Sequence, residues 1–365
     1  MKTGKMTVLH TETLKRWGGQ QNRVLLEAVG LNTRGHRAII ACNRGSALAR
    51  KAKESGVDVY EVNMTKQAHV RTIPSLMGII KKENVELVST HSSVDSWAGG
   101  LAARLMGRRL VRFRHNLYPV GRDPLTWFIY GIPHRIIAIS AQVKEVLTGC
   151  GIQGRKISVV PSSVDTEKYN SDVDDLRDEI GLPRDAIIIG NTSTFTELKG
   201  QEYLLQAFNT IHRRHPCYLL FAGDLEEPFR SQYLSHVEEG LRDRVVFLGH
   251  REDIPRVLKT LDIFVFPSFL EGLGTALLEA MVMGLPVAVS NIPTFREFIQ
   301  ERSEGIFFAP KNAGDIAEKV IALMKDHEMR RRLGNQARVT ALKKFSIGTM
   351  IDLTETRYRE VLNAV

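Results

Sequence analysis

The chain has 365 residues, of which 43% are hydrophobic and 25% charged, a composition typical of a globular protein and long enough for two α/β domains. No apolar run approaches the roughly 18 residues of a membrane-spanning helix, so the sequence predicts no such span. The net charge is +9, and the three cysteines lie far apart without metal-ligand spacing, which excludes a disulfide framework and a zinc site.

The first predicted strand covers residues 6–10 and has no signal-peptide core before it, so we expect a cytoplasmic protein. Gly18 and Gly19 follow, then Gln20 and a helical pattern that runs to residue 31. Glycines between a first strand and a first helix let the backbone approach a ligand at the carboxyl end of an open α/β sheet. The same pair is as often an ordinary tight turn.

Apolar strands and helical patterns then alternate, with short loops, up to residue 160. This alternation predicts a parallel, doubly wound sheet as the first domain, residues 1–163. His91 and His115 each follow directly after a predicted strand. A lone histidine is more often structural than catalytic, whereas the carboxyl end of a parallel sheet is where ligands bind.

The excess positive charge is concentrated between residues 96 and 134, where six arginines accompany one acid, Asp123. Such a segment can attract anionic lipid headgroups, phosphorylated glycans or nucleic acid. No nucleic-acid motif accompanies it, and Trp127, Phe128 and Tyr130 indicate an interfacial wedge. An anionic membrane surface is therefore a candidate partner and nucleic acid is not. The alternative is a solvated basic face.

The strand and helix alternation restarts at residues 186–190, after a hinge that begins at Ser162. The second domain is expected over residues 164–345, with a last helical segment over 346–365 that would cross back to the first domain. Lys199 lies between a loop and the next helix, where a lysine can bind a pyrophosphate or can be a plain surface residue.

The most informative stretch is 267–286, PSFLEGLGTALLEAMVMGLP. It follows an apolar strand at 263–266 and becomes helical after the glycines of 272–274. A helix start directs unpaired backbone N–H groups and a positive dipole end at an anion. Glu271 and Glu279 would lie about 12 Å apart on a continuous helix, which is too far to share a proton but suits the hydroxyls of one extended ligand.

Glu271 and Glu279, with seven residues between them, resemble the E-x7-E signature of the family four retaining glycosyltransferases, and the resemblance extends over nearly the whole chain. It implies the GT-B fold, with two Rossmann-like doubly wound domains facing each other across a cleft. A nucleotide-sugar would be the co-substrate and no other cofactor is expected. The donor-binding residues that it implies are Gly18, Gly19, Thr194, Lys199, His250, Arg251, Glu271, Gly272, Leu273, Gly274, Thr275 and Glu279. The acceptor-binding residues that it implies are Gln20, His91 and His115, and the catalytic residues are His115, Glu271 and Lys199.

The resemblance also implies a role for each group. Lys199 and the N–H groups around 272–275 would bind the departing diphosphate, Glu271 the sugar hydroxyls and Glu279 the ribose, with His115 beside the transferred sugar. Where the family usually has an arginine, this chain has Thr194, which supplies one neutral hydrogen bond in place of a bidentate charged one. Backbone, lysine and helix dipole can replace a metal, so we expect metal-independent catalysis.

The sequence therefore predicts a retaining glycosyltransferase whose donor is a nucleotide-diphosphate sugar, expected to be a UDP-sugar. The acceptor would be a glycan or lipid-linked molecule of cell-envelope polysaccharide or lipopolysaccharide biosynthesis, with the enzyme at the inner face of the membrane. The residues alone leave two alternative functions open. One is a sugar-nucleotide epimerase or hydrolase of the same fold, and the other is a non-catalytic nucleotide-sugar-binding protein, which Thr194 would favour.

Overall fold

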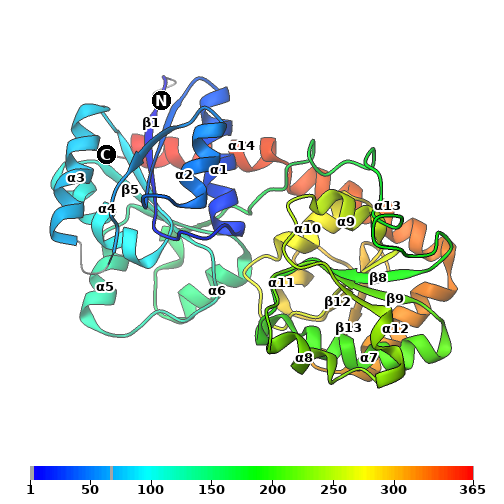
Figure 1. Ribbon diagram of the computed structural model, residues 1–365. Coiled ribbons are helices and arrows are strands. Elements are labelled where there is room, and N and C mark those ends of the chain that lie inside the picture. Colours follow the sequence, from blue (N-terminus) through cyan, green and yellow to red (C-terminus); the bar gives the residue numbers. More distant parts are fainter. Residues whose placement is uncertain (1–3, 66–68, 365) are drawn as a thin grey trace. The chain divides into compact units, whose positions relative to one another are not determined.

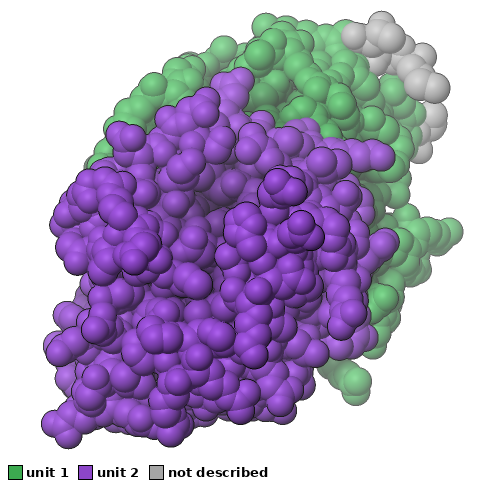
Figure 2. All heavy atoms as spheres, turned by 90° about the vertical axis from the view of Figure 1, so that its right-hand side faces the viewer, with its two compact units in different colours: residues 1–163, 347–365 green, residues 164–346 purple. Residues whose placement is uncertain are grey.

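The computed structural model describes residues 4–65 and 69–364 (Figure 1). The chain divides into two compact units, which Figure 2 shows in different colours. Unit 1 comprises residues 1–163 together with 347–365, and unit 2 comprises residues 164–346. The last helical segment therefore belongs to the first unit, although it follows the second in the sequence.

Unit 1 is built on a seven-stranded parallel sheet with the order β3-β2-β1-β4-β5-β6-β7. Its strands are β1 (Thr7–Glu12), β2 (Arg37–Cys42), β3 (Asp58–Glu61), β4 (Leu87–Thr90), β5 (Arg109–Arg114), β6 (Arg135–Ala138) and β7 (Ile157–Val159). Its helices are α1 (Gly19–Thr33), α2 (Ala47–Glu54), α3 (His69–Lys82), α4 (Ser93–Leu105), α5 (Pro124–Gly131), α6 (Ala141–Gly149) and α14 (Ile347–Asn363). The order of the strands reverses between β1 and β4, and at such a point open sheets bind ligands.

Both faces of the unit 1 sheet are covered, which explains why its strands are almost continuously apolar. Side chains of a strand alternate between the faces, so Val8 packs with α1, α2 and α14 whereas Leu9 packs with α3 and α4. Figure 1 shows α14, in red, beside α1, in blue. Ile351 and Tyr358 of α14 are completely or almost completely buried in the core on that face.

Unit 2 repeats the architecture with a six-stranded parallel sheet in the order β10-β9-β8-β11-β12-β13. Its strands are β8 (Ile188–Asn191), β9 (Tyr218–Phe221), β10 (Val245–Phe247), β11 (Ile263–Phe266), β12 (Val287–Ser290) and β13 (Gly305–Phe308). Its α-helices are α7 (Gln201–Arg214), α8 (Phe229–Leu234), α9 (Ile254–Thr260), α10 (Thr275–Val282), α11 (Pro293–Arg296), α12 (Ala313–Lys325) and α13 (His327–Lys344). The order again reverses next to the first strand, between β8 and β11.

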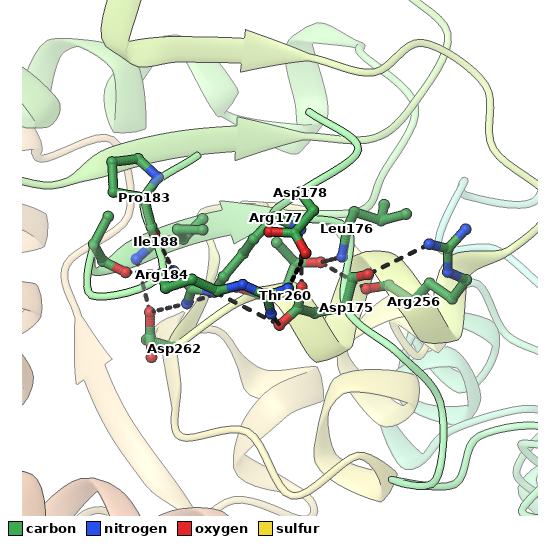
Figure 3. Close-up of polar contacts among 11 residues, drawn as sticks. Asp175, Leu176, Arg177, Asp178, Pro183, Arg184, Ile188, Arg256, Thr260 and Asp262 are labelled. Atoms are coloured by element: carbon green, nitrogen blue, oxygen red, sulfur yellow. Dashed lines mark hydrogen bonds and ion pairs between the residues drawn. The ribbon is translucent and has the colours of Figure 1, made fainter. Parts of the chain in front are cut away.

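One arginine of unit 2 fixes the irregular segment that leads into β8 (Figure 3). The Arg177 guanidinium donates to the carbonyls of Pro183 and Ala186, at 3.3 and 2.6 Å. It also donates to the carbonyl of Thr260 at 3.3 Å and to the Asp262 carboxylate at 3.0 Å. The loop before β8 is thus bound to the end of α9 and to the residue before β11, which holds the amino ends of β8 and β11 together.

The predicted fold class, two doubly wound α/β sheets, is confirmed. Helix ends follow their capping residues, because a side-chain acceptor satisfies the free N–H groups of the first turn. Ser140 Oγ accepts from the Val143 N–H at 3.2 Å, so α6 begins directly after Ser140. Asn312 Oδ1 accepts from the Asp315 N–H at 3.1 Å, so α12 begins at Ala313.

Candidate active site

The predicted anion site in unit 2 is the turn between β11 and α10. Gly274 immediately precedes α10 and has φ of 88°, the left-handed region that glycine adopts without strain. A Cβ at this position would lie 3.0 Å from the Phe295 ring and 3.1 Å from the Phe266 ring. No side chain caps α10, so its first backbone N–H groups can serve a ligand. Glycine is therefore needed at this turn for both its conformation and its size.

Lys199 and Glu271, separated by 72 residues, are in direct contact. Lys199 Nζ lies 2.5 Å from Glu271 Oε1, with the two side chains 26% and 10% exposed. The close approach of their loops depends on Gly200, which has φ of 65° and at which a Cβ would lie 2.4 Å from the Pro267 carbonyl oxygen. The Thr294 hydroxyl also donates to the Glu271 carbonyl at 2.7 Å, which fixes the turn. The structure thus brings together the two residues expected to bind the diphosphate and the sugar.

Glu279 lies within α10, and the hydroxyl of Tyr169 hydrogen-bonds to its carboxyl group. Burial raises the pKa of Glu279 to about 7, although the hydrogen bond from Tyr169 and the charge of Lys168 oppose the shift. This carboxyl group is therefore poised to change charge near neutral pH. Tyr169 comes from the segment before Arg177, which sequence reasoning did not connect with the site.

Two other predicted donor residues of unit 2 have different surroundings. His250 is exposed, with Nδ1 3.8 Å from Asp224 Oδ1. The Arg251 guanidinium is held by Asp253, with Nη2–Oδ2 of 2.6 Å, and by Glu179 at 3.2 Å. Arg251 thus neutralises local acids in this structure, instead of presenting an unpaired cation that could replace the arginine missing at Thr194.

Thr194 itself lies in the loop after β8. Thr194 is exposed, and its backbone carbonyl oxygen accepts a hydrogen bond from Gln201 Nε2 at 3.1 Å. The hydroxyl of a threonine can add one neutral hydrogen bond to a ligand here, so the charge for an anion must come from Lys199 and the start of α10.

In unit 1 the predicted glycine loop leads straight into a helix. Gly18 is extended, Gly19 is the first residue of α1, and no side chain caps this helix either. Gln20 donates to the carboxylate of Glu12, which also accepts from two backbone N–H groups of the loop that follows β1. Burial raises the pKa of Glu12 to about 7, and the nearby Asp95 adds to the shift. Gln20 is thus part of the support of this loop.

His91 and His115, at the ends of β4 and β5, are adjacent. His91 Nδ1 lies 3.2 Å from His115 Nε2, and both rings stack on Phe113, with centroids 4.7 and 5.8 Å away. Burial lowers the pKa of His115 to about 3 and also lowers that of His91. Both imidazoles are therefore neutral at physiological pH and can exchange hydrogen bonds but carry no charge.

Sequence reasoning missed three residues behind this pair. His10 Nδ1 lies 3.2 Å from His91 Nε2, and Glu27 and Tyr358 lie behind it. His10 follows the apolar pair Val8 and Leu9 in β1, and a single polar residue at that place is only a weak signal. Glu27 and Tyr358 lie on α1 and α14, 331 residues apart, where each reads as an ordinary member of an amphipathic helix.

The basic segment is less exposed than the sequence suggests. Arg112 is buried, with its guanidinium 3.8 Å from the Tyr130 ring centroid, and Arg114 donates to the Tyr130 hydroxyl at 2.7 Å. The expectation that all these arginines form one surface patch is wrong for Arg112, because both faces of β5 are covered and the Arg112 guanidinium packs against α5, where it donates to the Ile129 carbonyl at 3.4 Å. The apolar side of α5 is exposed instead, with Leu125 66%, Trp127 41% and Phe128 49% accessible.

No helix in the described part of the chain is long and apolar enough to cross a membrane. Within residues 4–65 and 69–364, no three or more histidine, cysteine, aspartate or glutamate side chains are grouped so that they could hold a metal ion. Asp172 and Asp174, which have an Asp-x-Asp spacing, are both exposed and belong to no such group.

Two family models match the chain in succession. The model described as Glycosyltransferase Family 4 matches residues 17–168, and that described as Glycosyl transferases group 1 matches residues 172–340. Together they span most of both units.

Curated relatives match over most of their length. An Escherichia coli UDP-Gal:alpha-D-GlcNAc-diphosphoundecaprenol alpha-1,3-galactosyltransferase is 27% identical over 310 residues, which cover 80% of each chain. An N-acetyl-alpha-D-glucosaminyl L-malate synthase of Bacillus anthracis is 26% identical, with 85% of this chain and 84% of that protein covered.

Among solved structures, a glycosyltransferase from Rickettsia africae ESF-5 has a TM-score of 0.90 and 22% identity, with 99% of this chain and 100% of that chain covered. Anabaena Alr3699/HepE, in complex with UDP-glucose, has a TM-score of 0.86 and 19% identity, with 97% of this chain and 100% of that chain covered. At these identities the two structures establish the shared fold.

Proposed function

We propose, from the premise that the chain belongs to the glycosyltransferases of GT-B fold, that it transfers a sugar from a UDP-sugar to a glycan or lipid-linked acceptor with retention of anomeric configuration. The observation that carries the proposal is the Lys199–Glu271 pair beside the uncapped start of α10. The names of the relatives support transfer to a diphosphate-linked lipid or a small hydroxy acid, and favour transfer over epimerisation or hydrolysis.

The pair suggests how a donor would be held. A diphosphate is a stronger anion than one carboxylate, so the Lys199 ammonium would move from Glu271 to the phosphates, which the first N–H groups of α10 also bind. Glu271, released from its cation, would then accept hydrogen bonds from the sugar hydroxyls. This exchange places positive charge where negative charge develops as the diphosphate departs, and such stabilisation is often the largest part of catalysis.

We also propose a role for one further group in each unit. Glu279, in its charged form, would accept hydrogen bonds from the ribose hydroxyls, with Tyr169 holding its carboxyl group. The neutral imidazole of His115 would hydrogen-bond to a hydroxyl at the reacting centre. We propose that the acceptor reacts on the face of the sugar from which the diphosphate leaves, and that the phosphate takes up its proton. No metal ion is needed in this scheme, because a lysine and a helix start bind the diphosphate.

The proposed acceptor is presented at a membrane surface. Leu125, Trp127 and Phe128 project from α5 with large exposed fractions, and Arg122 beside them is also exposed. Aromatic and leucine side chains flanked by arginine are suited to the boundary between headgroups and acyl chains. The Escherichia coli relative is named for an undecaprenol-linked acceptor, which supports the same class for this chain.

The decisive experiment screens UDP-, GDP- and ADP-sugars for an increase in melting temperature, and then tests transfer with the donor that binds. Saturation at one hundred times the dissociation constant stabilises a protein by about 2.7 kcal/mol. We expect stabilisation by a UDP-sugar, slow donor hydrolysis without acceptor, and a retained configuration in the product. If none of the three classes of nucleotide-sugar raised the melting temperature, the proposal would be contradicted.

A further inference from the structure

A continuous chain of polar side chains runs from His115 into the interior of unit 1. His115 Nε2 contacts His91 Nδ1 at 3.2 Å, and His91 Nε2 contacts Ser89 Oγ at 3.2 Å. The Ser89 hydroxyl is 3.0 Å from the hydroxyl of Tyr358, which is 2.5 Å from Glu27 Oε1. Every contact in the chain is within hydrogen-bonding distance.

This row of polar side chains is buried in the core of unit 1, and its members come from several helices and strands. Ser89, Tyr358 and Glu27 are fully buried, and His91 is 3% exposed. They come from β4, from α14 and from α1, so that the C-terminal helix supplies the link between the carboxylate and the histidines. The Arg23 guanidinium, 3.4 Å from Glu27 Oε2, provides the countercharge. A buried network of this kind has a specific arrangement of protons, because each unpaired group is costly.

The arrangement follows from counting protons along the chain. Tyr358 has one hydroxyl proton, and the Glu27 carboxylate can only accept, so that proton lies between them. The contact between Tyr358 and Ser89 then requires the Ser89 proton. With its proton used, Ser89 Oγ accepts from His91 Nε2.

The same count continues to the surface. A neutral His91 protonated at Nε2 has a lone pair at Nδ1 and accepts there from His115 Nε2. His115, also neutral, then carries its lone pair at Nδ1, the ring nitrogen for which no bond within the described residues is found. An imidazole in this tautomer accepts a hydrogen bond from a ligand hydroxyl.

His10 defines the competing arrangement. Its Nδ1 is also 3.2 Å from His91 Nε2, and its own Nε2 is buried without a partner. If His10 donated to His91, every proton from His91 outward would reverse and His115 would present an N–H group at Nδ1. That reversal sets the lone pair of Ser89 Oγ against the lone pair of His91 Nε2, because the Ser89 proton is already directed at Tyr358. The link through Tyr358 therefore opposes the reversal.

We propose that Tyr358, on the C-terminal helix, is a positioning residue that fixes the tautomer of His115, so that its Nδ1 accepts a hydrogen bond from a hydroxyl of the bound carbohydrate. The part of this inference that concerns carbohydrate rests on the proposed function, whereas the part that concerns the tautomer does not. Tyr358 acts through Ser89 and His91 and does not itself contact a substrate.

The test compares Tyr358→Phe with the wild type by long-range proton–nitrogen NMR of histidine-labelled protein at neutral pH. Signals are assigned with His91→Gln and His115→Gln variants. In the wild type we expect His115 to be protonated at Nε2 and unprotonated at Nδ1. In Tyr358→Phe the Ser89 proton is free to donate to His91, and we expect the protonated nitrogen of both histidines to change. Identical tautomers in the two proteins would overturn the proposal.

Tyr60→Phe is the matched control, because the Tyr60 hydroxyl also donates to a carboxylate, Glu83, at 2.6 Å, but lies on β3. It should leave the histidine tautomers unchanged. In transfer assays Tyr358→Phe should lower kcat by about tenfold and leave the donor KM within about twofold, since a correctly oriented group affects chiefly the reacting complex. An equal loss in Tyr60→Phe would count against a specific role.

Ser89→Ala breaks the same chain at another link and is the second variant if Tyr358→Phe folds poorly. The alanine removes the acceptor of the His91 Nε2 proton and, with it, the lone pair that opposes donation from His10 Nδ1, so the same change of tautomer is expected. Unchanged tautomers in Ser89→Ala would also refute the inference. Absence of any transfer by the wild type would instead refute the proposed function, and the NMR result would still decide the inference.

Discussion

Removal of the Lys199 charge tests the centre of the proposed site. Lys199→Met leaves the Glu271 carboxylate, only 10% exposed, without its partner 2.5 Å away. Surface pairs contribute about 0–1 kcal/mol and the loss of one partner of a buried pair costs about 3–5 kcal/mol. The intermediate burial of this pair gives an expected cost of about 2 kcal/mol, equivalent to about 6 °C in melting temperature for a unit of this size.

The complete double-mutant cycle separates the pair from other effects. Glu271→Gln should cost less than Lys199→Met, about 1 kcal/mol, because the ammonium left behind is more exposed than the carboxylate. The double variant should recover part of the loss, with a coupling free energy of about 1–2 kcal/mol. The pair Lys319–Asp315, which is longer at 4.0 Å and has side chains 40% and 26% exposed, is the control and should show a coupling below about 0.5 kcal/mol.

The same variants are then assayed with donor. Lys199→Met should reduce kcat/KM by about 10²–10³-fold, the usual effect of losing one group that stabilises developing charge. It should also abolish most of the thermal stabilisation by UDP, whereas Glu271→Gln should retain it, since Glu271 is assigned to the sugar. Wild-type stabilisation by UDP in Lys199→Met, or a coupling energy near zero, would refute the exchange of partners.

Three further predictions concern Glu279, the surface of α5 and metals. The folded-state pKa of Glu279 is raised to about 7, so between about pH 4.5 and 7 the folded state keeps a proton that the unfolded state has lost, and stability falls as pH rises through that window. Donor affinity should increase over the same range as the carboxylate forms. Glu279→Gln should flatten the affinity profile in titration calorimetry and make the stability profile in thermal melts less steep, with the contribution of Glu12 remaining; wild-type profiles in this variant would exclude Glu279 as the source. Replacing exposed Trp127 and Phe128 by serine should reduce co-sedimentation with anionic vesicles several-fold, whereas the equally exposed Phe229→Ser should not, and unchanged binding would rule out α5 as the contact. Turnover should persist in excess chelator, and its complete loss there would show that a metal is required.

The architecture could be predicted because both sheets are covered on both faces, which makes their strands short, apolar and alternate with helices. The strand, glycine turn and helix around Gly274 were predicted for the same local reasons. The contact of Lys199 with Glu271 could not be derived in this way, since it depends on Gly200 packing against Pro267, far away in the sequence.

Two kinds of misreading have a physical cause. Charge summed along the segment suggests a surface patch that includes Arg112, although β5 is a central strand whose two faces are both covered by helices. His10, Glu27 and Tyr358 give little signal in the sequence, because each reads as an ordinary residue of its own strand or amphipathic helix. Their polar atoms come into contact only when β1, α1 and α14 pack together. Sequence periodicity does not show which elements pack together when they lie so far apart in the sequence.

The placement of α14 has a consequence for how the protein is made. Residues 164–346 are contiguous and can condense as soon as they leave the ribosome, whereas the core of unit 1 lacks Ile351 and Tyr358 until residues 347–363 have been translated. Most of unit 1 is therefore synthesised before unit 2, but the core of unit 1 is completed after it. A nascent chain arrested before α14 would expose the apolar face of α1. Chaperones would therefore bind the incomplete core of unit 1 during the interval before α14 is translated.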